Sequence, residues 1–184
     1  MKKPVITANE ITLLRIAGTV ALLFLRPLSA WFFVIYALTG ITDAADGWLA
    51  RRTGTASPLG ARLDSVADLV FYGVMLIKLL PVLIKELPVR IFVFAGAVII
   101  LRLGAYVAAA VKYHRFAAVH TYMNKLTGAA VFLIPFALLT PYRIPYCICV
   151  CVIGAAASAE ELIIHLTRAS YDPNARSIFK GVGK

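Results

Sequence analysis

The fold class is decided by a single apolar stretch, PVRIFVFAGAVIILRLGAYVAAAVKYH, which occupies residues 88–114. A helix needs roughly 20 residues to cross the hydrocarbon core of a bilayer, and this stretch is longer. Its only Lys and Arg residues are Arg90, Arg102 and Lys112, and it contains no acid. We therefore predict a membrane-spanning helix over residues 88–114.

The composition of the whole chain agrees with that prediction. Of its 184 residues, 61% are hydrophobic and only 15% are charged, whereas a soluble domain is about 45–50% apolar and about 25% charged. Polar surface is too scarce to cover a globule of this size in water. The composition therefore excludes a soluble enzyme, a disordered chain and a disulfide scaffold.

Five further segments have the length and character of membrane spans. Proline closes several of them, and Ser57-Pro58 is a typical helix start. We predict an all-α integral membrane protein with six transmembrane helices in one domain, residues 1–184, and a polar cytoplasmic tail at 168–184. Besides 88–114, the expected spans are residues 11–25, 28–52, 57–81, 122–140 and 144–167.

The distribution of Lys and Arg predicts the orientation of these spans. With both termini in the cytoplasm, twelve of the 19 cationic residues fall on the inner side, five on the outer side and two within spans. Positive charge is concentrated on the cytoplasmic side of membrane proteins. The net charge of +10 then indicates cytoplasmic loops and contact with anionic membrane lipids, and not a nucleic-acid partner.

Four of the nine acids stand where the second and third spans meet. Asp43 and Asp46 are three residues apart, and Asp64 and Asp68 are four apart, so each pair shares a helical face. A short turn between the spans would bring the pairs opposite each other. Four carboxylates at a membrane edge would repel, and Mg²⁺ or Mn²⁺, which prefer oxygen ligands, would resolve that repulsion.

Two other interpretations of the aspartates remain open at this point. The carboxylates can pair with Arg51, Arg52 and Arg62 as a solvated cluster of charges. They can also line the path of a membrane cation or proton-coupled transporter, because intramembrane acids mark such paths.

The residues between the aspartates form a gapped pattern. Asp43 precedes Asp46-Gly47 by three residues. The pattern continues with two residues, Ala50-Arg51, eight residues, Gly60, three residues, Asp64, three residues and Asp68. It resembles, at every fixed position, the signature of the CDP-alcohol phosphotransferase family.

The resemblance implies an activity for the chain. The donor would be CDP-linked, usually CDP-diacylglycerol, and CMP would be the leaving group in a reaction of phospholipid biosynthesis. Two divalent ions would be held by all four aspartates, and Asp68 would also be the base for the acceptor hydroxyl. The resemblance also suggests a homodimer.

Other positions of the signature suit a nucleotide diphosphate. Gly47, Ala50 and Gly60 are small enough to allow close approach, either of the diphosphate or of a neighbouring helix. Arg51 can bind phosphate oxygens with two parallel hydrogen bonds. We therefore expect these four residues to bind CDP.

Polar residues in the other spans are candidates for further roles. Asn9, Thr12 and Arg15 share one face of the first span, where they either help to bind the nucleotide or satisfy neighbouring polar groups. A second set of cations would form a basic pocket for an anionic acceptor or, alternatively, contact lipid phosphate or an acid such as Glu160 or Glu161. This set is Arg102, Arg115 and Lys125.

The acceptor alcohol stays open. Phosphatidylglycerophosphate synthases usually have other residues at the positions of Ser65 and Leu69. Phosphatidylserine synthases usually have another residue at the position of Ala45, and phosphatidylinositol-phosphate synthases at that of Leu69. We expect transfer of a phosphatidyl group to a small polar, anionic acceptor. The active site would lie at the cytoplasmic face of a bacterial or archaeal cell membrane.

Overall fold

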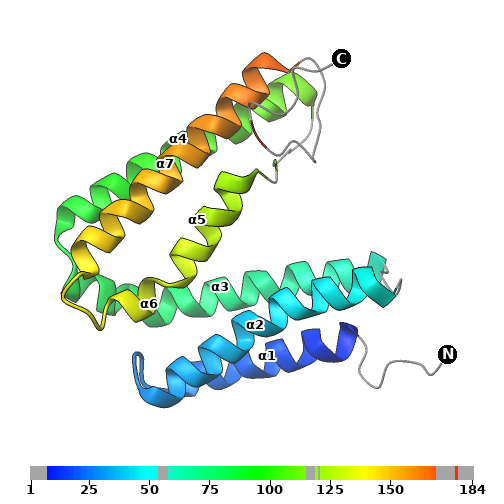
Figure 1. Ribbon diagram of the computed structural model, residues 1–184, viewed down its shortest axis with the longest axis vertical. Helices are drawn as coiled ribbons and strands as arrows, with labels where there is room; N and C mark the ends of the chain where they lie inside the picture. Colours follow the sequence, from blue (N-terminus) through cyan, green and yellow to red (C-terminus); the bar gives the residue numbers. More distant parts are fainter. Residues whose placement is uncertain (1–7, 54–57, 115–118, 120, 169–176, 178–184) are drawn as a thin grey trace. The chain divides into compact units, whose positions relative to one another are not determined.

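The structure is a computed structural model that describes residues 8–53, 58–114, 119, 121–168 and 177. For residues 8–11, 43–53 and 58–65 it describes the helical backbone and not the side chains. Figure 1 shows the helices. Their bounds are α1 Ala8–Phe24, α2 Ala30–Thr53, α3 Pro58–Glu86, α4 Val89–Tyr113, α5 Tyr122–Phe132, α6 Ile134–Ala137 and α7 Arg143–Thr167.

The chain divides into two compact units, residues 1–85 and 86–184, and each is described by itself. In the first unit α1 and α2 lie side by side (Figure 1). They approach closely at Gly18, where an added Cβ would lie 2.7 Å from Oγ1 of Thr39. The rings of Tyr36 and Phe71 stack with centroids 5.6 Å apart and join α2 to α3.

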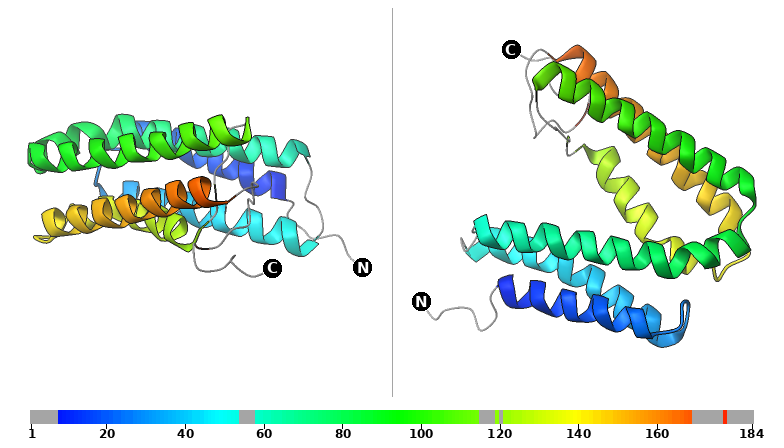
Figure 2. Two further views of the ribbon diagram at one scale, coloured as in Figure 1. Left: turned by 90° about the horizontal axis from the view of Figure 1, so that it is seen from above. Right: turned by 180° about the vertical axis from the view of Figure 1, so that it is seen from behind.

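In the second unit α4 and α7 run side by side, as both views of Figure 2 show, and α5 and α6 contact α7. Small residues form much of the buried surface between the two long helices, as is common where membrane helices approach closely. Gly154 of α7 is one example, because a Cβ there would lie 3.2 Å from Cγ1 of Val98. Buried Ala105, Ala109 and Ala157 are others.

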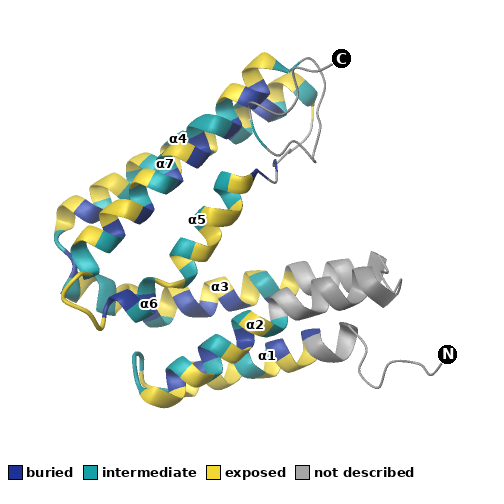
Figure 3. Ribbon diagram, viewed as in Figure 1, coloured by how far each residue is buried: buried dark blue, intermediate teal, exposed yellow. Residues whose placement is uncertain are grey.

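The described helices are suited to a bilayer. Three segments are long and apolar enough to cross a membrane, namely Val66–Glu86, Val89–Tyr113 and Arg143–Thr167, and Thr12–Phe24 and Ala30–Thr42 are shorter apolar helices. Figure 3 shows exposed positions along the long helices. Many of them carry large apolar side chains, such as Phe24, Leu69 and Ile100, which are mostly uncovered. In lipid such faces are compatible with their surroundings. The all-helical, membrane-type fold expected from the sequence is therefore confirmed in outline.

Two predicted helix ends are wrong, and both involve proline. The third span was expected to end near Pro81, but α3 continues through Pro81 to Glu86. The fifth was expected to be one helix over 122–140, but it breaks at Leu133 into α5 and α6. Pro135 lies in the first turn of α6, where its missing N–H breaks no intrahelical hydrogen bond.

Candidate functional site

The four aspartates of the sequence pattern lie on helical backbone, near the connection between α2 and α3. Asp43 and Asp46 belong to the last turns of α2, and Asp64 and Asp68 to the first turns of α3. The two helices are separated by four residues, so the C-terminal end of α2 and the N-terminal end of α3 are neighbours. The side chains of Asp43, Asp46 and Asp64 lie outside the described residues.

Asp68 is the aspartate whose side chain the structure describes. Its Oδ1 accepts a hydrogen bond from Nη1 of Arg15 on α1, with the two atoms 2.6 Å apart. The two partners differ in exposure. Only 1% of the Arg15 side chain is accessible, compared with 41% of the Asp68 side chain. The cation is enclosed, and part of the carboxylate surface remains open.

Arg15 belongs to a buried stripe along α1. Thr12, Arg15, Thr19 and Leu22 recur at the spacing of one helical face, and all four are buried. The hydroxyl of Thr19 donates to the backbone oxygen of Arg15 across 2.8 Å. A charge within a membrane segment requires a partner, and for Arg15 that partner is Asp68. For Arg15 the structure thus shows contact with a neighbouring polar group, while the side chain of Asn9 lies outside the described residues.

The donor set of the aspartates fits divalent cations. Four carboxylates from the adjoining ends of two consecutive helices supply hard oxygen ligands, which suit Mg²⁺ or Mn²⁺. The open surface of the Asp68 carboxylate agrees with such a role. Among the described side chains, a set that omits three of these four aspartates, no group of three or more His, Cys, Asp or Glu residues is placed to hold a metal ion.

The expected CDP-binding residues occupy the same two helix ends. Gly47, Ala50 and Arg51 lie in α2 and Gly60 lies in α3. Their side chains, where they have one, lie outside the described residues. Their roles therefore stay predictions.

A second polar cluster lies in the other unit, around Glu161 of α7, whose side chain is fully buried. Arg102 of α4 forms an ion pair with its carboxylate. Oε1 of Glu161 accepts from the backbone N–H of Val119 at 3.0 Å, and Oε2 from Nδ2 of Asn124, also at 3.0 Å. Nε2 of His165 lies 3.7 Å from Oε1. Glu161 thus joins α4, α5 and the chain before α5 to α7.

The members of this cluster were predicted only in part. Glu161 was expected as a possible partner of Arg102, together with Glu160, and the structure places Arg102 on Glu161. Asn124 and His165 were not expected. The signal for His165 is its spacing of four residues from Glu161 within an apolar helix, which puts both on one face.

The cations expected at the acceptor site have different surroundings. Arg102 is 22% exposed, and Glu161 balances its charge. Lys125, near the start of α5, is exposed, and Arg115 lies outside the described residues. Lys112 donates to the backbone oxygens of His165 and Leu166 across 2.9 and 2.8 Å and so satisfies carbonyls at the end of α7.

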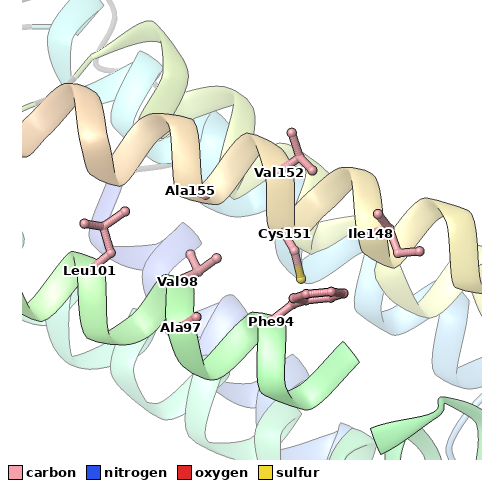
Figure 4. Close-up of a pocket in the computed structure, with 8 residues that line it drawn as sticks. All are labelled: Phe94, Ala97, Val98, Leu101, Ile148, Cys151, Val152 and Ala155. Carbon is pink, nitrogen blue, oxygen red and sulfur yellow. The ribbon is translucent and has the colours of Figure 1, made fainter. Parts of the chain in front are cut away.

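An apolar groove lies between α4 and α7 and has a volume of about 320 Å³. Figure 4 shows Phe94, Val98 and Leu101 on one wall and Cys151, Val152 and Ala155 on the other. The wall carries almost no polar surface, and the groove belongs to helices suited to a bilayer. It offers no group for phosphate or metal binding.

Comparison with known proteins gives a match over most of the chain. The sequence model of the family described as CDP-alcohol phosphatidyltransferase matches residues 5–165. The chain is also similar to a CDP-diacylglycerol–serine O-phosphatidyltransferase of Methanocaldococcus jannaschii, with 38% identity over 74 residues, which cover 40% of this chain and 34% of the relative.

Two bacterial relatives carry a different name, CDP-diacylglycerol–glycerol-3-phosphate 3-phosphatidyltransferase. The protein of Cereibacter sphaeroides is 42% identical over 66 residues, which cover 33% of this chain and 30% of the relative. That of Pseudomonas fluorescens is 39% identical over 77 residues, which cover 39% of each protein. The chain therefore matches about a third of the length of these relatives. No solved structure matches it significantly.

Proposed function

Because this chain belongs to the CDP-alcohol phosphatidyltransferase family, we propose that it transfers a phosphatidyl group from CDP-diacylglycerol to the hydroxyl of a small polar acceptor, with release of CMP. The observation that carries the proposal is the complete aspartate pattern from Asp43 to Asp68 at the adjoining ends of α2 and α3. The partly open carboxylate of Asp68 supports a role in contact with substrate.

In the proposed reaction Asp68 takes a proton from the acceptor hydroxyl. The hydroxyl oxygen forms a bond to the phosphorus of the phosphatidyl group, and the bond from that phosphorus to the bridging diphosphate oxygen breaks. CMP leaves with the electron pair. Arg51 would hold phosphate oxygens of the donor through its planar guanidinium, and Gly47, Ala50 and Gly60 would leave room for the nucleotide.

The four aspartates would hold two Mg²⁺ or Mn²⁺ ions. When bound, such ions neutralise the charge of the diphosphate and favour in-line displacement at phosphorus. The aspartates' own contribution is to orient the donor by fixing these charges at the edge of the bilayer, where the lipid tails can stay in the hydrocarbon region.

The acceptor would bind through cations of the second unit. Lys125 is exposed near the start of α5, so it can reach a carboxylate or phosphate on the acceptor, and Arg115 would assist it. Arg102 would act with them while paired to Glu161, which also holds Asn124 beside Lys125. The names of the relatives make serine and glycerol 3-phosphate the first acceptors to test.

The proposed membrane arrangement keeps both substrates accessible. Six spans with cytoplasmic termini would place the ends of α2 and α3 at the cytoplasmic face of a bacterial or archaeal membrane. The cytidine group and the acceptor would then arrive from water. The whole chain would act as one domain and assemble as a homodimer.

A direct assay tests the proposal. The purified chain in micelles containing CDP-diacylglycerol and Mg²⁺ or Mn²⁺ is offered serine, glycerol 3-phosphate, inositol phosphate or inositol, and CMP is measured. We expect CMP release with one acceptor, loss with EDTA, and loss in Asp68→Asn. The control Glu86→Gln, a carboxylate change in the second unit, should retain activity. Absence of CMP release with every acceptor would overturn the proposal and favour a transporter.

A further inference from the structure

The contact between Arg15 and Asp68 is unusual for an ion pair that only stabilises a membrane fold. A lone carboxylate and a lone guanidinium both gain from complete enclosure together, since either is costly in hydrocarbon. Here the guanidinium is enclosed, with 1% of the side chain accessible, while 41% of the Asp68 side chain is accessible. The arrangement encloses the cation and leaves part of the Asp68 side chain accessible.

The backbone that carries Arg15 is held firmly. Gly18, one turn later on α1, touches Thr39 of α2 so closely that a Cβ would not fit without movement. At the far end of α1, the backbone oxygen of Leu23 accepts a hydrogen bond from Nζ of Lys78 on α3, with the two atoms 2.9 Å apart. The same two helices are therefore joined at Asp68 and again at Lys78, ten residues further along α3.

An arginine at position 15 is also well suited to orient the Asp68 carboxylate. A guanidinium is planar and its N–H groups point in fixed directions, so the hydrogen bond from Nη1 to Oδ1 constrains the position of that carboxylate oxygen. A lysine would supply the charge without that directional constraint.

We propose that Arg15 is a positioning residue for Asp68, which fixes the rotamer of the carboxylate that receives the acceptor's proton. The inference rests on the proposed function, since it assigns Arg15 a part in that reaction. Only 1% of the Arg15 side chain is accessible, so the role assigned to it is not direct contact with a substrate. It acts through Asp68, in the way that residues behind a reactive group commonly change activity about 10- to 100-fold when they are replaced.

The test compares three variants: Arg15→Gln, Arg15→Lys and the matched control Lys78→Gln. The control breaks a different polar link between α1 and α3, from Lys78 to Leu23, and so it reports the effect of loosening this helix pair away from Asp68. Each variant is purified in micelles, its thermal midpoint is measured, and kcat and KM are determined for CDP-diacylglycerol. Mn²⁺ binding is measured separately by electron paramagnetic resonance, without substrates.

We expect Arg15→Gln to lower kcat by about 10-fold or more, with KM for the donor within twofold of wild type. Arg15→Lys should restore part of kcat, and Lys78→Gln should stay within twofold in both constants. Mn²⁺ should bind less tightly to Arg15→Gln than to wild type, because the Asp68 carboxylate would lose the hydrogen bond from Arg15 that orients it. If Arg15→Gln does not fold, the kcat of Arg15→Lys is compared with that of Lys78→Gln. A lower kcat in Arg15→Lys then supports the positioning role, and equal values overturn it.

Two results overturn the inference while leaving the proposed function intact. One is an active wild type whose Arg15 and Lys78 variants have equal kcat. The other is tighter Mn²⁺ binding by Arg15→Gln, which would mean that Arg15 competes with a cation for Asp68. A wild-type chain that releases no CMP overturns the proposed function instead.

Discussion

Replacement of Glu161 by leucine is expected to destabilise the second unit by at least about 3 kcal/mol. Glu161 is fully buried and forms an ion pair with Arg102. Removal of one partner from a buried pair costs about 3–5 kcal/mol. Because the Arg102 guanidinium lies in a helix suited to a membrane and would lose its acidic partner, the lower end of that range is a minimum.

The hydrogen bonds of Glu161 add to this cost, so about 3 kcal/mol is a minimum. Hydrogen bonds between side chains in membrane proteins average only about 0.6 kcal/mol, so loss of the bond from Asn124 adds a small amount. The buried N–H of Val119 loses its acceptor, which costs about 1–3 kcal/mol where no replacement exists. Glu161→Gln keeps an acceptor oxygen and loses the charge, so it should fall between wild type and Glu161→Leu.

The free energy of unfolding is measured by titrating the purified chain in micelles with SDS and following helix content by circular dichroism. The fluorescence of Trp31 and Trp48, which both lie in the first unit, provides an internal reference. The control is Glu86→Gln, whose carboxylate lies 3.5 Å from Arg143 with both side chains about one-third exposed. Such an exposed pair contributes at most about 1 kcal/mol. Equal destabilisation by Glu161→Leu and Glu86→Gln would refute the reasoning.

Three further predictions concern the site and the packing. Asn in place of Asp43, Asp64 or Asp68 should each lower turnover by about 10²–10³ or more, because each removes a charge from the proposed diphosphate site; an unchanged kcat in any of them, or activity in EDTA, would contradict the proposed two-ion site. Lys125→Met should raise KM for the acceptor far more than KM for CDP-diacylglycerol, and equal changes would argue against an acceptor role. Gly18→Val should lower the free energy of unfolding by about 1–3 kcal/mol through overpacking, which thermal denaturation in micelles can check.

Helix positions were largely predictable because apolar length and polar breaks are local properties of the sequence. The two prolines show the limit of that reasoning. Pro81 stays inside α3, and membrane helices tolerate such a residue when neighbouring groups satisfy the freed carbonyl. Pro135 instead begins a new short helix. Which outcome occurs depends on tertiary contacts that the local sequence does not contain.

The candidate site was predictable to different degrees for similar reasons. The aspartate pattern is read from spacing within two consecutive helices, so it appears in the sequence directly. The pair of Arg15 and Asp68 joins residues 53 positions apart. Whether the two side chains meet depends on the register in which α1 packs against α3, which the local sequence does not specify. From spacing alone, Glu160 and Glu161 were equally good candidates for the partner of Arg102. The orientation of α7 about its axis buries Glu161 against Arg102.

The ion pair of Arg102 and Glu161 also bears on how the chain is made. Its partners are 59 residues apart, and synthesis proceeds at about 5–20 residues per second, so α4 exists for about 3–12 seconds before the partner of its arginine emerges. During that interval the guanidinium must remain near the interface, where a long side chain can reach water. Final packing of α4 therefore waits for the last helix. A ribosome that stalls before α7 would leave the charge of Arg102 without Glu161.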